Sequence, residues 1–213
     1  NTALHELIKN TIKAHKRIIF NGNGYDDAWI REATEERGLL NLRTTPDAIS
    51  MLIQKDNMEM LIAHKVYTES EIRSRYEILL ENYCKVVRIE ALTMVDMAKK
   101  EILPAVEAYV SSLVSVASAK RSLDADIPSS YEQKLIKRLA TLVDTIDCRT
   151  ASLESEMVKL DTISDFAEEA AFIRDKVIPK MSELRVAADE AETLTAESYW
   201  PFPTYGDLLF GVK

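Results

Sequence analysis

Glycine, proline and cysteine are scarce in this sequence, and each scarcity narrows the possible folds. The 213 residues include only five glycines, six prolines and two cysteines. So few helix-breaking residues favour a mostly helical chain. Cys84 and Cys148 belong to no CxxC motif and no Cys/His cluster, so neither a zinc site nor a disulfide framework is indicated. We expect both to be reduced thiols buried inside helices.

Basic residues are outnumbered, with 27 against 35 acidic residues, which gives a formal net charge of −8. A nucleic-acid interface needs clustered lysine and arginine, so this balance argues against nucleic acid as a partner. No apolar run approaches the length of a membrane span, and the N-terminus has no signal-peptide core. We therefore expect no membrane partner and a cytoplasmic location.

One long helix, from Thr68 to Leu123, dominates what the sequence does contain. Thr68 and Glu71 form a capping box, in which each satisfies an amide of the first turn. Apolar residues then recur at steps of three and four, which turns one stripe toward a partner. This predicted stripe consists of Ile72, Tyr76, Leu79, Tyr83, Val86, Met94, Ala98, Ile102, Ala105, Tyr109, Leu113 and Val116. Because Pro104 lies inside the helix, we expect a kink near Lys100.

Two further long helices are predicted after it. Tyr131–Thr162 carries a heptad of apolar residues that is interrupted at Arg149. Ser164 is the predicted cap of the next helix, over residues 165–194, with a kink at Pro179. Short turns between long helices place them antiparallel, so we expect an all-α fold built as an elongated antiparallel three-helix bundle.

Residues 1–67 are predicted to form a cluster of short helices at one end of the bundle. The predicted ranges are 2–20, 26–37, 46–54 and 57–64. Thr45 is the expected N-cap of the third, with Pro46 at its first position. The predicted division of the chain is therefore 1–67, a bundle over 68–198 and a tail over 199–213.

The tail departs from the helical pattern. Pro201 and Pro203 exclude a helix where they stand, so we expect an extended strap packed on the bundle's own surface. The alternative is that the tail contacts another subunit or domain, since contiguous apolar surface marks interfaces. The candidate packing or interface residues of the tail are Trp200, Phe202, Tyr205 and Phe210.

No arrangement typical of catalysis or metal binding stands out. None of the three histidines stands three residues after a glutamate, as a di-iron site in a helical bundle requires. Glu90 and Asp96 are carboxylates in an otherwise apolar stretch. They are either partners of buried basic residues or rim residues of an interface, and we prefer the interface.

Five segments stand out when they are taken in order: HKRIIFNGNGY at 15–25, GLLNLRTTP at 38–46, SRYE at 74–77, IEA at 89–91 with ILPA at 102–105, and the tail at 199–210. Together they resemble the C-terminal region of the type III glutamine synthetases, the large bacterial form of that enzyme. Five segments in the same order cover nearly the whole chain and are more specific together than any one of them.

The resemblance implies a parent enzyme that joins ammonia to glutamate with ATP and magnesium or manganese, and that forms a dodecamer of two stacked rings. It also implies that the catalytic domain lies upstream, because no metal-binding glutamate set or glutamate-binding loop is found here. This chain, which begins without an initiator methionine, would then be a piece with no catalytic, cofactor-binding or metal-binding residue. Its partners would be the upstream catalytic domain and other subunits.

Two roles remain open for the chain itself. An assembly module should show a broad apolar face, whereas a regulatory module for a signalling protein or small effector should show a pocket with convergent polar groups. An unrelated helical adaptor is a third alternative. The sequence offers apolar stripes without such convergence, so we prefer assembly.

Overall fold

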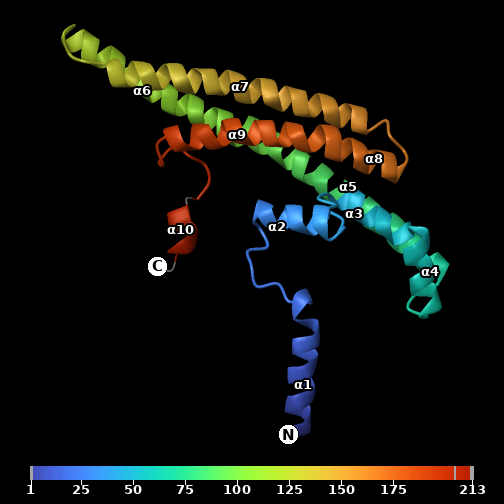
Figure 1. Cartoon of the computed structure of the whole chain (residues 1–213). Helices are drawn as coiled ribbons and strands as arrows, with labels where there is room; N and C mark the ends of the chain where they lie inside the picture. Colours follow the sequence, from blue (N-terminus) through green and yellow to red (C-terminus); the bar gives the residue numbers. More distant parts are fainter. Residues whose placement is uncertain (1, 204, 212–213) are drawn as a thin grey trace. The chain divides into compact units, whose positions relative to one another are not determined.

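The computed structural model describes residues 2–203 and 205–211, which form helices and contain no strand (Figure 1). The all-α prediction is thus confirmed for the described part of the chain. Packing divides the chain into two compact units, Asn1–Arg43 and Thr44–Lys213. The finer division predicted at residues 67 and 198 stays a prediction.

The first unit is small and leaves most of its side chains exposed. Its helices are α1 (Thr2–His15), the 3-10 turn η1 (Lys16–Ile18), α2 (Asp27–Arg31) and the π turn η2 (Glu32–Glu36). Asp26 caps α2, because its carboxylate accepts a hydrogen bond from the Ala28 N–H at 3.0 Å. The rings of Phe20 and Trp29 stack with their centroids 4.0 Å apart.

The second unit opens with short helices that lie against the long one. They are α3 (Thr45–Ile49), the 3-10 turn η3 (Ser50–Ile53) and α4 (Lys55–Ala63). The predicted cap at Thr45 is wrong by one residue: Thr44 is the N-cap, and its hydroxyl accepts from the Asp47 N–H at 3.4 Å. Either threonine can cap a helix, and the backbone turns extended at Thr44.

A continuous helix then runs through Glu69–Leu123. Its parts are α5 (Glu69–Met97), the π turn η4 (Ala98–Ile102) and α6 (Leu103–Leu123). The predicted capping box is confirmed: the Thr68 N–H donates to the Glu71 carboxylate at 2.8 Å, and the Glu71 N–H donates to the Thr68 hydroxyl at 3.3 Å. The Thr68 bonds also lower the pKa of Glu71.

The predicted inward stripe of this helix is partly wrong. The buried apolar residues of α5 are Ile72, Leu80, Cys84, Val87, Ala91 and Val95, whereas Leu79 and Val86 are exposed. Val116 of α6 is exposed as well. Because α5 carries apolar residues on both faces, spacing alone predicts an apolar stripe without deciding which one faces the core.

Both prolines inside the long helices follow a π turn. The kink expected near Lys100 stays a prediction. At that place the structure has the π turn η4, where the Leu103 N–H donates to the Ala98 carbonyl five residues back. This wider turn accommodates Pro104, which lacks an N–H and clashes with the preceding turn of a regular helix. The third long segment repeats this arrangement, with Pro179 directly after its own π turn.

That third segment consists of α8 (Phe166–Phe172), the π turn η5 (Ile173–Val177) and α9 (Ile178–Leu194). The predicted cap at Ser164 is wrong by one residue. Asp165 caps α8, and its carboxylate accepts from the Ala167 and Glu168 N–H groups at 2.9 Å. An aspartate also complements the positive end of the helix dipole.

The helix α7 (Ser130–Leu160) packs against α6 and against α9 (Figure 1). Its buried apolar residues are Leu139, Leu142, Ile146, Leu153, Met157 and Leu160, as the heptad predicts. Where the heptad is interrupted at Arg149, the buried residue is the next one, Thr150. Its hydroxyl donates a hydrogen bond to the Ile146 carbonyl at 2.7 Å. Arg149 is exposed and forms an ion pair with Glu183 of α9.

The two cysteines differ in burial, which corrects one expectation. Cys84 lies in the core, and burial raises its pKa to about 11. Cys148 is exposed, so its predicted burial is wrong. It stands two residues from both Ile146 and Thr150, which are buried, and two residues rotate a helix by roughly 200°.

Among the described residues, one helix, Glu69–Leu123, is long and apolar enough to span a membrane by length and composition alone. Its best window has a mean hydropathy of 1.5, but this value is an average, and the sequence has no uninterrupted apolar run of that length. Only 17% of that window is buried. A single helix of this kind is weak evidence for a membrane span, so we assign the window no membrane role.

Candidate interaction surface

The first part of the tail packs on the bundle. Trp200 and Phe202 are half-buried against the core, and their rings meet edge-on with centroids 6.2 Å apart. The Tyr199 ring lies 5.2 Å from that of Tyr109 in α6. We refer to residues 199–202 as the strap; the choice between the two roles given for the tail stays a prediction.

The rest of the tail differs from the strap. Residues Tyr205–Leu209 form a short helix, α10, where an extended chain was expected. Phe210 is 80% exposed, and Leu208 and Leu209 are exposed as well. The side chain of Tyr205 lies outside the described part of the structure. The described apolar side chains after Pro203 therefore make no contact of the kind that the strap makes.

A cavity of about 330 Å³ lies between the strap, the end of α5 and α9. It is lined mainly by apolar side chains, with charged groups from α9. The lining residues are Met94, Met97, Ala98, Ile102, Leu184, Arg185, Ala188, Asp189, Glu192, Trp200 and Phe202. Arg185 and Asp189 form an ion pair at 3.3 Å, one turn apart on α9. The site is an apolar hollow with three charges, assembled only in the folded chain.

Glu90 and Asp96 are both exposed on α5. Asp96 forms an ion pair with Lys100 one turn later. Glu90 borders a second hollow, of about 290 Å³, between α5 and α9. Neither carboxylate forms an ion pair with a buried basic residue among the described residues, and their role at an interface stays a prediction.

An exposed apolar stripe runs along α5 on the side away from the core, and it was not singled out from the sequence. We refer to it as the outer stripe, and its members are Ile78, Leu79, Val86, Ile89 and Leu92. These five side chains are between 43% and 64% exposed. Contiguous exposed apolar surface of this kind marks interaction sites in proteins.

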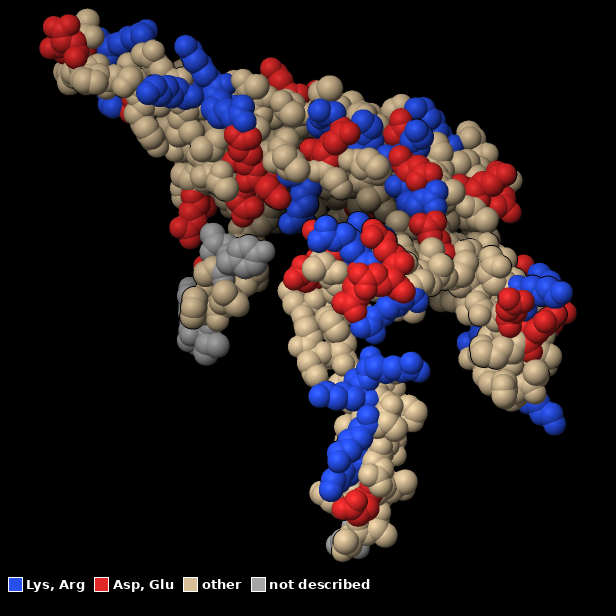
Figure 2. All heavy atoms as spheres, in the orientation of Figure 1, with Lys and Arg blue, Asp and Glu red and all other residues tan. Residues whose placement is uncertain are grey.

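The helix α1 also has an uncovered apolar side. Leu4, Leu7, Ile8 and Ile12 stand at helical spacing and are at least half exposed, and the helix has no buried residue. Figure 2 shows lysine and arginine side chains along one side of α1 with uncharged side chains beside them. Such an amphipathic helix needs a partner for its apolar side.

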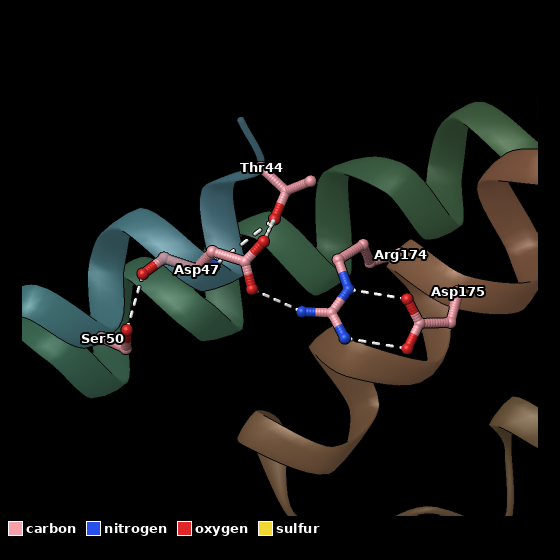
Figure 3. A network of polar contacts seen from close by, with 5 residues as sticks. All are labelled: Thr44, Asp47, Ser50, Arg174 and Asp175. Carbon is pink, nitrogen blue, oxygen red and sulfur yellow. Dashed lines mark hydrogen bonds and ion pairs between the residues drawn. The ribbon is translucent and has the colours of Figure 1, made fainter. Parts of the chain in front are cut away.

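A polar network ties α3 to the third long segment (Figure 3). Arg174 in η5 donates to the Asp47 carboxylate at 2.5 Å and to both oxygens of Asp175 at 2.7 and 2.8 Å. The Asp175 bond raises the pKa of Arg174, and the guanidinium in turn lowers the pKa of Asp175. The Thr44 hydroxyl donates to Asp47 as well, so the network fixes the start of the second unit.

A sequence profile described as the glutamine synthetase C-terminal domain matches residues 3–121. This range includes α1, the short helices, α5 and nearly all of α6.

Three relatives match almost the whole chain, each over 98% of its length. They are a glutamine synthetase of Butyrivibrio fibrisolvens at 39% identity, a type-3 glutamine synthetase of Dictyostelium discoideum at 30%, and a glutamine synthetase of Bacteroides fragilis at 27%. The chain spans 29–30% of the length of these relatives.

Proposed function

Because the chain belongs to the glutamine synthetase C-terminal domain family, we propose that it is the non-catalytic helical part of a type III glutamine synthetase and serves subunit packing. Its three long segments would act as an elongated antiparallel bundle that holds neighbouring parts of an oligomer in place. In the parent protein this oligomer would be the dodecamer that the resemblance implies.

The observation that carries this proposal is the outer stripe of α5. A helix that belongs to one bundle alone needs apolar residues only on the side that faces its neighbours. The five apolar residues of the outer stripe add a second apolar side that the described chain leaves uncovered. The apolar side of α1 is uncovered in the same way, and we assign it to contact with the upstream catalytic domain.

The proposed ligase chemistry, from ATP, glutamate and ammonia to glutamine, is assigned to the rest of the longer chain. The described residues contain no group of three or more histidine, cysteine, aspartate and glutamate side chains placed to hold a metal ion. We assign the magnesium or manganese ion of the parent enzyme to the rest of the longer chain as well. We derive no catalytic step from these residues.

A regulatory role is the second candidate, and the cavity beside the strap favours it. Apolar walls with a few charged groups are typical of small-molecule sites. In this alternative an effector would occupy the space between Met94, Leu184 and Trp200. In a Trp29→Phe background the remaining tryptophan is Trp200. A change in its fluorescence when small metabolites are added would support this regulatory role.

The assembly proposal is tested by the solution mass of the 213-residue chain. Sedimentation velocity over a concentration series should show a mass that rises above the 24.1 kDa of one chain. A parallel assay should detect no glutamine formed from ATP, glutamate and ammonia. A mass of one chain at every concentration would contradict the packing role, and detectable ligase activity would contradict the non-catalytic role.

A further inference from the structure

Charged residues flank the outer stripe of α5 at both ends, and acidic and basic residues follow the same order at each end. Residues at steps of three or four share one face of a helix. Along the exposed face of α5 and into η4 they are Glu71, Arg75, Ile78, Asn82, Lys85, Ile89, Leu92, Asp96 and Lys100, with Leu79 and Val86 beside them. At both ends of this face an acid precedes a base by four residues.

This order of charges is complementary to itself when a second copy of the helix packs antiparallel to the first, because acids then face bases. With a twofold axis between Lys85 and Val86, Glu71 comes level with Lys100 of the second copy. In the same register Arg75 comes level with Asp96, and both contacts occur twice by symmetry. Two opposite-charge pairs at each end therefore share one register.

The apolar residues agree with that register. Val86 lies to one side of the axis, so the Val86 side chains of the two copies meet there. Leu92 of the second copy comes level with Leu79. The neighbouring residue Ile78 lies on the same side of the helix as Leu92, so these two side chains come close together in this register. At the middle of the face Ile89 comes level with Asn82, which is polar but uncharged. The register thus places an apolar contact at the axis and another toward each end.

Lys85 is the one charged residue of this face that comes near its own counterpart. Its ammonium forms an ion pair with Glu81 of its own chain at 2.6 Å, and this pair offsets the repulsion between the two copies. The methylene groups of Lys85 can then cover the apolar side chains beside the axis while the charged end stays in water.

We propose that the outer stripe of α5 is a homotypic interface, at which a second copy of this chain packs antiparallel about a twofold axis between Lys85 and Val86. This inference rests on the proposed role in assembly and names the surface, the partner and the register. The occupant is a second copy because the order of the end charges is complementary to itself, a property that contact with an unrelated surface does not require.

The apolar contacts supply the affinity of this interface, and the charges set its direction. All four end charges are exposed and already have contacts in their own chain. Arg75 lies over the Tyr67 ring with 4.6 Å from its guanidinium carbon to the ring centroid, Glu71 bonds to Thr68, and Asp96 pairs with Lys100. Exposed pairs of this kind contribute little energy, but like charges in the same places oppose a register.

The sharpest test reverses one charge at a time. Two copies of an Arg75→Glu chain would bring two carboxylates together at each end, and two copies of an Asp96→Arg chain would bring two guanidinium groups together. Each variant should weaken self-association by about tenfold or more in sedimentation equilibrium. An equimolar mixture of the two should recover the wild-type affinity, because both end contacts then join opposite charges. The Arg75→Glu/Asp96→Arg double variant should recover it as well.

Matched controls exist on the same helix. Arg73→Glu reverses an exposed charge that pairs with Glu69 and lies off the outer stripe, so self-association should stay unchanged. Val86→Asp should abolish self-association, whereas Val116→Asp should not. These two valines are 43% and 44% exposed and belong to one continuous helix. Circular dichroism of each variant confirms that the helices remain.

The outcomes separate this inference from the proposed function. If the chain self-associates but Val86→Asp has no effect, or the mixed variants fail to recover, the homotypic interface is wrong while the assembly role stands. That result would assign the outer stripe to another occupant, such as a segment of the longer chain. If the wild-type chain has the mass of one chain at every concentration, both proposals are wrong.

Discussion

The two faces of α5 both carry large apolar side chains but differ in what covers them. The inner face, with Leu80, Cys84 and Ala91, is buried by the other helices of the second unit. The outer face, with Ile89 and Leu92, also carries large apolar side chains and remains exposed. The difference teaches that one face builds the fold, while the other is available for a contact beyond the described chain.

The largest expected effect separates the two faces by stability. Leu80→Ala should lower the free energy of unfolding by about 3 kcal/mol, because it leaves a cavity in the core. Ile89→Ala should change it by less than about 0.5 kcal/mol in a chain diluted until it is monomeric. Urea denaturation followed by circular dichroism measures both. Equal losses would remove the distinction between an inner and an outer face.

The tail also has a part that packs on the core and a part that is exposed, and the expected difference between them is smaller. Deleting residues 199–213 should lower the free energy of unfolding by about 2 kcal/mol, because Trp200 and Phe202 leave the core surface. Deleting only residues 204–213 should leave it nearly unchanged, since the described apolar residues of that stretch are exposed. Thermal melts of both truncations test this. An unchanged melting temperature for the longer deletion would contradict packing by the strap.

A buried polar contact between α6 and α7 gives a further test of what stabilises the interior of the second unit. Glu132 is buried, one of its oxygens has no hydrogen-bond partner, and the other accepts from the Lys120 ammonium at 2.6 Å. Lys120→Met should lower the melting temperature at neutral pH, because it leaves a buried carboxylate without its partner.

The pH dependence of that variant has a definite sign. The Lys120 bond lowers the pKa of Glu132, so the pair stabilises the fold above the ordinary carboxyl range and loses its effect as the pH falls through the lowered pKa. The difference between Lys120→Met and the wild type should therefore shrink in acid. A difference that stays constant from neutral to acidic pH would mean that the pair does not act through ionised Glu132.

The smallest perturbation compares the two thiols. A disulfide reagent at neutral pH should modify Cys148 quickly and Cys84 slowly, since Cys84 is buried and its pKa is raised to about 11. Titration of native protein should give one fast thiol per chain, and denatured protein should give two. Two fast thiols in the native chain would show that the inner face of α5 opens readily.

Periodicity and capping predicted most of the helices, because these signals are local. The capping box of Thr68 and Glu71 begins α5, and the heptad of α7 is buried at nearly every predicted position. Two caps were displaced by one residue, at Thr44 and Asp165, because the neighbouring Thr45 and Ser164 have equally suitable side chains. The family resemblance is confirmed by the sequence profile over residues 3–121.

Features that depend on packing were not predictable in the same way. Local spacing could not decide which apolar face of α5 is inward, so Leu79 and Val86 were assigned to the wrong side. The cavity beside the strap joins Met94 to Trp200 across more than a hundred residues, and no local pattern marks it. The outer stripe had a sequence signal, the self-complementary order of its end charges, which becomes meaningful only once those residues are known to be exposed.

The central claim is tested most directly by cross-linking at the proposed twofold axis. In a Cys148→Ser background, Val86→Cys places a thiol next to its own counterpart in the second copy, whereas Val116→Cys places one at equal exposure on another part of the helix. A short bis-maleimide should convert most of the Val86→Cys chain to a covalent dimer and little of the Val116→Cys chain. No dimer at position 86, or equal yields at both positions, would contradict the account.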